Sequence, residues 1–149
     1  MATISEGELR KRMIFFDKAK DLTDNSTFVR AKIGAVAIYK GKVIGKGYNS
    51  FKTHPIQKKY NAYRDGFGEK SETTHQNSMH AEIMCLLSIK NKEDIDWSKV
   101  QLYIYRKCIE RPHGIARPCR ACEEFIRELG IEHIFYTLDE DFQYESFKS

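Results

Sequence analysis

Apolar residues recur along this chain in two rhythms, which divide it into predicted helices and strands. Over residues 6–20 they recur every three or four positions, which predicts an amphipathic helix. Residues 33–39 form a compact apolar run and residues 43–48 a shorter one, and Lys40-Gly41-Lys42 between them predicts the turn of a hairpin. The remaining predicted elements are helices over 80–89 and 119–129 and strands over 100–105 and 131–136.

The order of the predicted elements indicates an α/β fold. After the first helix and the hairpin, the chain alternates helix, strand, helix, strand, as crossover units do. We therefore expect a mixed sheet covered by helices, with the hairpin near the N-terminus and the last two strands parallel. The segment 49–78 shows no clean period and is predicted as a long loop. The acidic tail over 139–145 contains aromatic residues, so we expect it to dock against the domain.

Length and composition fit one globular domain, and we predict a single domain over residues 1–149. The chain is 41% hydrophobic and 12% aromatic, which is too rich for a disordered protein. No apolar run approaches the roughly 20 residues that span a bilayer, and the polar N-terminal residues lack the apolar stretch of a signal peptide. We therefore expect a cytoplasmic protein with no membrane partner. The net charge of +4 is far below that of a dedicated nucleic-acid binder.

The four cysteines carry the first chemical signal. In a reducing compartment, cysteines serve metal binding or catalysis more often than disulfides. Cys119 and Cys122 lie three positions apart at a predicted helix start, so both sulfurs can reach one ion. The positive end of the helix macrodipole favours their thiolate form there. Cys85 lies within an apolar helix and is predicted as a core residue.

A second helix start carries His80 and Glu82. Two thiolates and one imidazole form a typical catalytic zinc set, which leaves the fourth position for water. In the first turn of a helix both side chains can face the metal, and there Glu82 serves better as a proton shuttle than as a ligand. A structural alternative stays open, in which Cys108 or His113 supplies a fourth ligand and closes the site.

Together, the His-Ala-Glu motif at 80–82 and the Pro-Cys-Arg-Ala-Cys motif at 118–122 resemble the zinc-dependent cytidine and deoxycytidylate deaminase superfamily. The segments 33–36 (Ile-Gly-Ala-Val) and 47–49 (Gly-Tyr-Asn) add to the resemblance, which covers a core of about residues 31–137. The resemblance implies a three-layer α-β-α sandwich of the cytidine deaminase type. It also implies a chain that self-associates, so we expect a homo-oligomer.

The resemblance assigns roles to individual residues. It implies one Zn²⁺ per chain, whose ligands would be His80, Cys119 and Cys122. Glu82 would be the general acid and base of the reaction. Asn49, at the end of its strand, would hydrogen-bond the sugar or the base of the substrate, and the backbone N–H groups of Ala81 and Cys119 would face the reacting base.

Two further segments bear on the substrate. Lys52-Thr53-His54-Pro55 resembles a loop of phage-type members of the superfamily, and we expect Lys52 and His54 to contact the substrate. The family usually passes from a strand to Pro-Cys within a few residues, whereas residues 106–117 intervene here. Basic residues in and beside that insertion would suit a phosphorylated substrate: Arg106, Lys107, Arg111, Arg117 and Arg120.

The leading functional hypothesis is hydrolytic deamination of cytosine to uracil in a nucleoside or nucleotide, of the deoxycytidylate type. The first alternative is a cytosine or adenine deaminase that acts on single-stranded DNA or RNA, with residues 49–78 and 106–117 forming the channel. The second alternative is a non-catalytic structural zinc-binding module. The expected partner is a small cytosine nucleoside or nucleotide, or a single-stranded nucleic acid under the first alternative.

Overall fold

The computed structural model describes residues 2–52, 54–62 and 78–148. Residues 53 and 63–77, which belong to the predicted loop, lie outside the described residues. The strands are β1 (Ala2–Thr3), β2 (Lys32–Tyr39), β3 (Lys42–Tyr48), β4 (Gln101–Lys107), β5 (His133–Thr137) and β6 (Phe142–Ser146). The helices are α1 (Glu6–Thr23), α2 (Pro55–Asn61), α3 (Ala81–Leu87) and α4 (Arg120–Leu129), with short 3-10 turns η2 (Lys92–Asp94) and η3 (Trp97–Lys99). Of these described helices, none combines the length and the apolar character that crossing a membrane requires.

The strands form one mixed sheet in the order β1-β6-β5-β4-β2-β3. β2 and β3 make the predicted antiparallel hairpin, and β4 and β5 run parallel, as the alternation of elements predicted. The hairpin turns through Lys40 and Gly41, which both have positive φ (52° and 79°). Such a pair of left-handed residues matches the twist of the two strands it joins.

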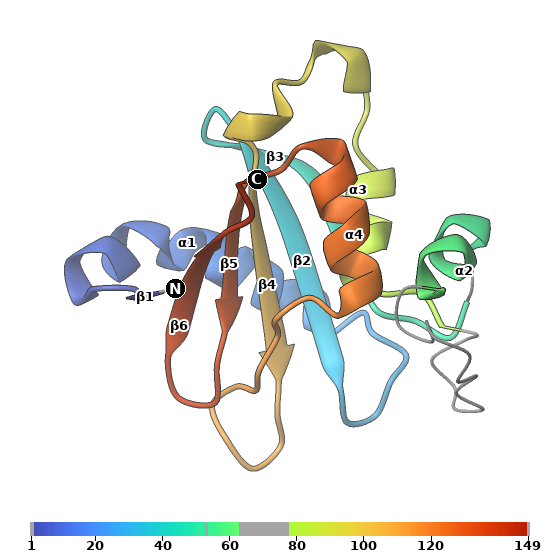
Figure 1. Cartoon of the computed structure of the whole chain (residues 1–149). Coiled ribbons are helices and arrows are strands. Elements are labelled where there is room, and N and C mark those ends of the chain that lie inside the picture. Colours follow the sequence, from blue (N-terminus) through green and yellow to red (C-terminus); the bar gives the residue numbers. More distant parts are fainter. Residues whose placement is uncertain (1, 53, 63–77, 149) are drawn as a thin grey trace.

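Helices cover both faces of the sheet, which confirms the three-layer α-β-α architecture (Figure 1). α1 lies on one face, and α3 and α4 lie on the other, with α2 packed beside α4. In β2, Ala35 and Ala37 join the core under α3 and α4, whereas Val36 and Ile38 join the core under α1. The run of apolar residues in this strand is continuous because both of its faces are buried.

One prediction about the irregular segments needs correction, and a second is confirmed with added detail. The segment 49–78 is not loop throughout, because residues 55–61 form α2. This helix is short and polar in sequence, and it depends on burial of Gln57 and Tyr60 against the rest of the protein. The docking of the acidic tail is confirmed, but part of it is a strand, β6, which pairs with β5 and in turn holds β1.

α3 packs directly on β3 because this strand carries glycine where the helix backbone comes closest. A side chain at Gly47 would put its Cβ only 2.3 Å from the carbonyl oxygen of Ala81 and 2.4 Å from the backbone nitrogen of Cys85. Contacts this short do not occur, so only glycine allows the helix to lie so close to the strand. The first turn of α3, where the predicted site begins, is therefore positioned by contact between two backbones.

Candidate metal centre and cavity

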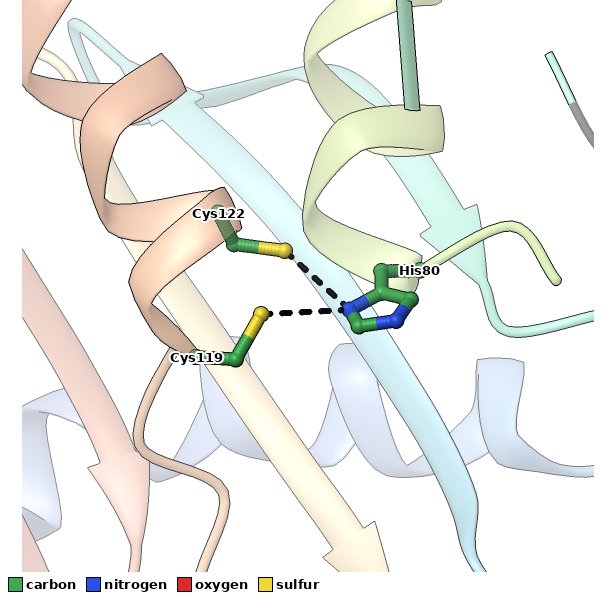
Figure 2. Close-up of side chains that lie close together, drawn as sticks. All are labelled: His80, Cys119 and Cys122. Atoms are coloured by element: carbon green, nitrogen blue, oxygen red, sulfur yellow. Dashed lines mark hydrogen bonds between the residues drawn. The ribbon is translucent and has the colours of Figure 1, made fainter. Parts of the chain in front are cut away.

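The starts of α3 and α4 bring the two predicted motifs together (Figure 2). His80 is the N-cap residue of α3 and Cys119 that of α4, and neither side chain caps its own helix. Cys122 lies in the first turn of α4, so its sulfur points in the same direction as that of Cys119. Three side chains from segments about 40 residues apart thereby converge on one point.

The geometry of this triad fits a zinc ion. Nδ1 of His80 lies 3.5 Å from Sγ of Cys119 and 3.3 Å from Sγ of Cys122, and all three donor atoms lie within 4.8 Å of one another. Tetrahedral zinc with bonds of about 2.3 Å to sulfur and about 2.0 Å to nitrogen places such atoms roughly 3.5 Å apart. The donor set and its spacing therefore match a zinc site with three protein ligands.

The electrostatic environment of Cys119 also suits a metal ligand. A hydrogen bond from the Cys122 thiol, and a smaller contribution from the His80 ring, lower the pKa of Cys119 to about 4, although burial opposes the shift. Zinc binds the thiolate form of cysteine, so a low pKa removes the proton in advance. Cys85, by contrast, is fully buried in the core as predicted, and burial raises the pKa of its thiol.

The structural alternative of a closed site with four ligands has no support in the part of the chain that the structure describes. No fourth cysteine, histidine or carboxylate there joins the group formed by His80 and the two cysteines. His113 lies against Tyr105 and Phe142, and its Nδ1 is 2.5 Å from the carbonyl oxygen of Leu138. The sulfur of Cys108 lies beside Gly114, in the segment that follows β4, where a Cβ added to this glycine would be only 2.6 Å from the sulfur.

A cavity of about 270 Å³ opens onto the triad. Its lining includes His80, Cys119 and three more of the predicted site residues: Asn49, Ala81 and Glu82. Apolar side chains of Phe28, Ile33 and Ile115 complete much of the remaining wall. A small concave site with apolar walls and a few convergent polar groups is typical of a binding site for a small molecule.

Glu82 is the one carboxylate in this lining, as far as the structure describes it. The residue is only 5% exposed, and burial raises the pKa of its carboxyl group, with the nearby His80 ring opposing the shift. It lies outside the group of atoms that could ligate one ion.

Asn49 joins the ends of the hairpin strands at the cavity wall. Its Oδ1 accepts hydrogen bonds from the backbone N–H of Ile33 (2.9 Å) and from Oγ of Ser26 (2.5 Å). Its Nδ2 donates one hydrogen bond to the carbonyl oxygen of Ala31 (2.5 Å). These bonds fix the orientation of the amide and use one of its two N–H donors.

The two predicted substrate contacts in the 52–55 stretch lie elsewhere. Lys52 is exposed, and His54 is the N-cap of α2, where Nδ1 accepts a hydrogen bond from the backbone N–H of Ile56 (3.0 Å). Neither is among the described residues that line the cavity. The structure thus brings six of the eight predicted site residues together: Asn49, His80, Ala81, Glu82, Cys119 and Cys122.

Sequence reasoning missed Gln57, which supports the site from α2. Gln57 is fully buried, its Oε1 accepts a hydrogen bond from the backbone N–H of His80 (2.9 Å), and its Nε2 donates to Oδ1 of Asn61 (2.8 Å). The dipeptide His54-Pro55 was the available signal, because an N-cap followed by proline is typical of a helix start.

The five basic residues in and beside the 106–117 insertion differ in their ion pairs. Lys107 pairs with Asp24, Arg111 with Asp139, and Arg117 with both Glu123 and Glu145. Of the five basic residues, Arg106 and Arg117 line the cavity.

Comparison with known proteins agrees with this geometry. The family model described as "Cytidine and deoxycytidylate deaminase zinc-binding region" matches residues 10–138. The dCMP deaminase of cyanophage S-TIM5 in its apo form superposes with a TM-score of 0.55 at 19% identity, over 87% of this chain and 83% of that chain. The cytidine deaminase of Burkholderia pseudomallei superposes with a TM-score of 0.58 at 18% identity, over 90% and 91%. These similarities show a common fold, and no curated protein sequence matches the chain.

Proposed function

The chain belongs to the cytidine and deoxycytidylate deaminase family, and we propose that it converts cytosine to uracil in a nucleoside or nucleotide, of the deoxycytidylate type. The observation that carries this proposal is the arrangement at the two helix starts. Three zinc-type ligands converge there, and two of them, His80 and Cys119, line one small cavity together with a buried carboxylate. The proposal places the activity in one domain over residues 1–149.

The chemistry of the proposal is a hydrolysis in which the amino group on C4 of cytosine is exchanged for oxygen. Bound zinc would lower the pKa of water enough to supply hydroxide near neutral pH. Glu82 takes one proton from the water and delivers it to N3 of the ring, and it then takes the proton of the hydroxyl group formed on C4 and delivers it to the departing amino group. The bond from C4 to oxygen forms, the bond from C4 to nitrogen breaks, and ammonia leaves.

The remaining residues of the cavity would hold the substrate. Asn49 offers its second amide proton to the sugar or the base, and its other hydrogen bonds keep it in place. The first-turn backbone N–H of Ala81 would face the base, beside the apolar walls formed by Ile33 and Ile115. Among structures with the same fold, the S-TIM5 enzyme was solved in complex with dCMP and dUMP, which supports a nucleotide ligand for this cavity.

One observation favours a second candidate, a deaminase that acts on single-stranded nucleic acid. Phe51 is 55% exposed and contacts Phe28, a residue of the cavity wall, with ring centroids 4.3 Å apart. An exposed aromatic ring beside the site, here that of Phe51, is a surface on which a neighbouring base can stack. Under this candidate, affinity for oligonucleotides should fall steeply with salt concentration, and oligonucleotides should outcompete free nucleotides.

The decisive experiment measures ammonia release by the zinc-loaded protein across a panel of substrates. The panel holds cytosine and adenine nucleosides, their 5′-monophosphates and short single-stranded oligonucleotides. A cytosine nucleoside or nucleotide should be the best substrate, and Glu82→Gln should lower turnover by at least about 100-fold while zinc stays bound. The matched control is Glu140→Gln, which removes an exposed carboxylate in the turn before β6 and should leave turnover unchanged.

Absence of ammonia with every substrate would contradict the proposed function and favour a non-catalytic zinc module. Near-normal turnover by Glu82→Gln would contradict the role of that residue. The homo-oligomer that the family resemblance implies is tested separately, by light scattering of the zinc-loaded protein during gel filtration.

A further inference from the structure

We propose that Thr137 is a positioning residue for substrate binding, because it holds the segment between β4 and α4 in place as one wall of the cavity. This segment, residues 108–117, is called the wall segment. The inference rests on the proposed function and assigns a residue that acts on the substrate through the wall segment.

The end of the wall segment forms part of the cavity lining. Ile115, Ala116 and Arg117 line the cavity, directly before the zinc-type ligand Cys119. Ala116 is buried, whereas Ile115 is half-exposed. Residues 108–117, all of which the structure describes, form neither a helix nor a strand of the sheet. The backbone of the wall segment therefore needs other hydrogen bonds to keep its position.

Thr137 supplies such bonds between the wall segment and the sheet. It is the last residue of β5 and is fully buried. Its Oγ1 donates a hydrogen bond to the carbonyl oxygen of Gly114 (2.6 Å) and accepts one from the backbone N–H of Arg106 (3.2 Å). Its carbonyl oxygen accepts a hydrogen bond from the backbone N–H of Ala116 (2.8 Å). Thr137 thus binds the wall segment on both sides of Ile115, so the position of Ile115 beside the cavity is fixed from two neighbouring residues.

The turn after β5 adds two outer contacts to the wall segment. Nδ1 of His113 lies 2.5 Å from the carbonyl oxygen of Leu138, and His113 is buried. Arg111 forms an ion pair with Asp139 (2.8 Å), and both of these side chains are half-exposed. An exposed ion pair contributes little, whereas a buried hydrogen bond is costly to lose. The contacts of Thr137 and His113 therefore hold the wall segment more firmly than the ion pair does.

The hydroxyl group of Thr137 matters here beyond the shape of the side chain. Valine would fill nearly the same volume, but its methyl group can neither donate to Gly114 nor accept from Arg106. Buried polar groups in proteins are almost always hydrogen-bonded, so the wall segment would move until the carbonyl group of Gly114 found another partner. A wall that adopts several positions weakens binding, because only a fraction of the molecules then has the cavity in the shape that binds.

The test compares KM and kcat of the zinc-loaded wild type, Thr137→Val and Thr137→Ser. The substrate is deoxycytidine 5′-monophosphate, or deoxycytidine if the wild type turns it over faster. Thr137→Val should raise KM by roughly 3- to 10-fold, the usual effect of one lost hydrogen bond, and leave kcat within about twofold. Thr137→Ser keeps the hydroxyl group and should restore KM to within about twofold of wild type.

The matched control is Thr23→Val on α1. Thr23 is also fully buried, and its Oγ1 also donates to a backbone carbonyl oxygen at 2.6 Å, that of Lys20. Thr23 does not line the cavity as far as the structure describes it. This variant should lose stability in thermal unfolding, as Thr137→Val does, but its KM should equal that of wild type.

Hydrogen exchange followed by mass spectrometry measures the wall segment directly. The peptide 113–117 should exchange faster in Thr137→Val than in wild type or in Thr23→Val, because a general loss of stability would affect both variants. If Thr137→Val does not fold, His113→Phe replaces it. That variant keeps a ring against Tyr105 and Phe142 but loses the contact with Leu138, and it should likewise raise KM and leave kcat unchanged.

Four results would overturn the inference. They are an unchanged KM in Thr137→Val, an equal rise of KM in Thr23→Val, a KM that Thr137→Ser does not restore, and a fall of kcat beyond twofold in Thr137→Val. The third would assign the effect to packing of the side chain, and the fourth would make Thr137 a support of the zinc centre. Each of these requires an active wild type, so it leaves the proposed function standing. A wild type that releases no ammonia would instead overturn the proposed function and this inference with it.

Discussion

The two faces of the sheet are built for different purposes. On one face a single helix, α1, closes over aromatic side chains: Phe16 is fully buried, with its ring centroid 5.2 Å from that of Tyr103 and 4.6 Å from that of Phe142. On the other face two short helices begin side by side, Glu82 is buried in the wall of a cavity, and Gln57 is buried with a hydrogen bond to the backbone of His80. The first face supplies stability through apolar burial, whereas the second uses part of that stability to hold polar groups away from water.

The largest effect is expected from a substitution on the α1 face, and it should change stability without changing KM. Phe16→Ala should lower the free energy of unfolding by about 3–5 kcal/mol, because it leaves a cavity in the aromatic cluster. KM should not change in the protein that remains folded, since Phe16 lies on the face away from the site. Denaturant unfolding and steady-state kinetics measure the two quantities. Ile14→Ala, at a position 58% exposed on the same helix, should change stability by less than about 0.5 kcal/mol. A raised KM for Phe16→Ala would contradict the separation of the two faces.

A smaller effect, on both stability and metal retention, is expected at Gln57. Gln57→Met has a similar shape but cannot accept the hydrogen bond from the backbone N–H of His80. The variant should lose about 1–3 kcal/mol of unfolding free energy, because that donor stays buried. It should also lose zinc to a chelator faster than wild type does, as followed with a coloured indicator. Lys58→Met, an exposed change on the same helix, is the matched control. Unchanged zinc retention would mean that α2 stabilises the fold without positioning the ligand.

The free energy of unfolding should depend modestly on pH through Glu145, at the edge of the face that carries the cavity. Hydrogen bonds from Arg117, and one from the Tyr136 hydroxyl, lower the pKa of Glu145, with burial opposing the shift. A carboxyl group with a lowered pKa in the folded state stabilises the protein above its unfolded pKa of about 4.3, and this contribution is lost as the pH falls through the folded value. Glu145→Gln should therefore be less stable than wild type at pH 7 by about 1 kcal/mol at most, and the difference should vanish near pH 2. Unfolding curves at several pH values check this, and a difference that grows toward low pH would contradict it.

The smallest effect is expected at Cys108. Cys108→Ala should keep its zinc and its activity, because the described geometry places the zinc-type ligands elsewhere. Zinc content by mass spectrometry and ammonia release are the measurements. Loss of zinc together with unfolding would support the alternative in which Cys108 is a fourth zinc ligand of a closed structural site.

Much of the fold was accessible from the sequence because its signals are local. The apolar run of β2 indicated a buried strand, and Gly130, with a φ of 94°, ends α4 as predicted from its position after the apolar helix. The two motifs identified the triad, because a pair of cysteines three positions apart and a histidine, each at a helix start, are together typical of a zinc site.

What the sequence could not show depends on contacts between distant segments. α2 is a short polar helix whose burial of Gln57 and Tyr60 appears only once α4 is in place beside it. β6 alternates aromatic and polar residues too weakly to be predicted as a strand, and its pairing with β5 supplies the missing stability. Similarly, the sequence gives no reason to distinguish the basic residues in and beside the 106–117 insertion, and only the ion pairs of the structure separate Arg106 from Lys107, Arg111 and Arg117.

The contact of α3 with the glycine of β3 has a consequence for how such a protein can diversify. The start of α3, which carries His80 and Glu82, is positioned by one backbone resting on another and by the hydrogen bond from His80 to Gln57, so its placement does not depend on the side chains that line the cavity. The wall residues, among them Phe28, Ile115 and Arg106, come from loops and a strand end. Mutations in these segments can therefore exchange one substrate for another while the inherited reaction continues to work.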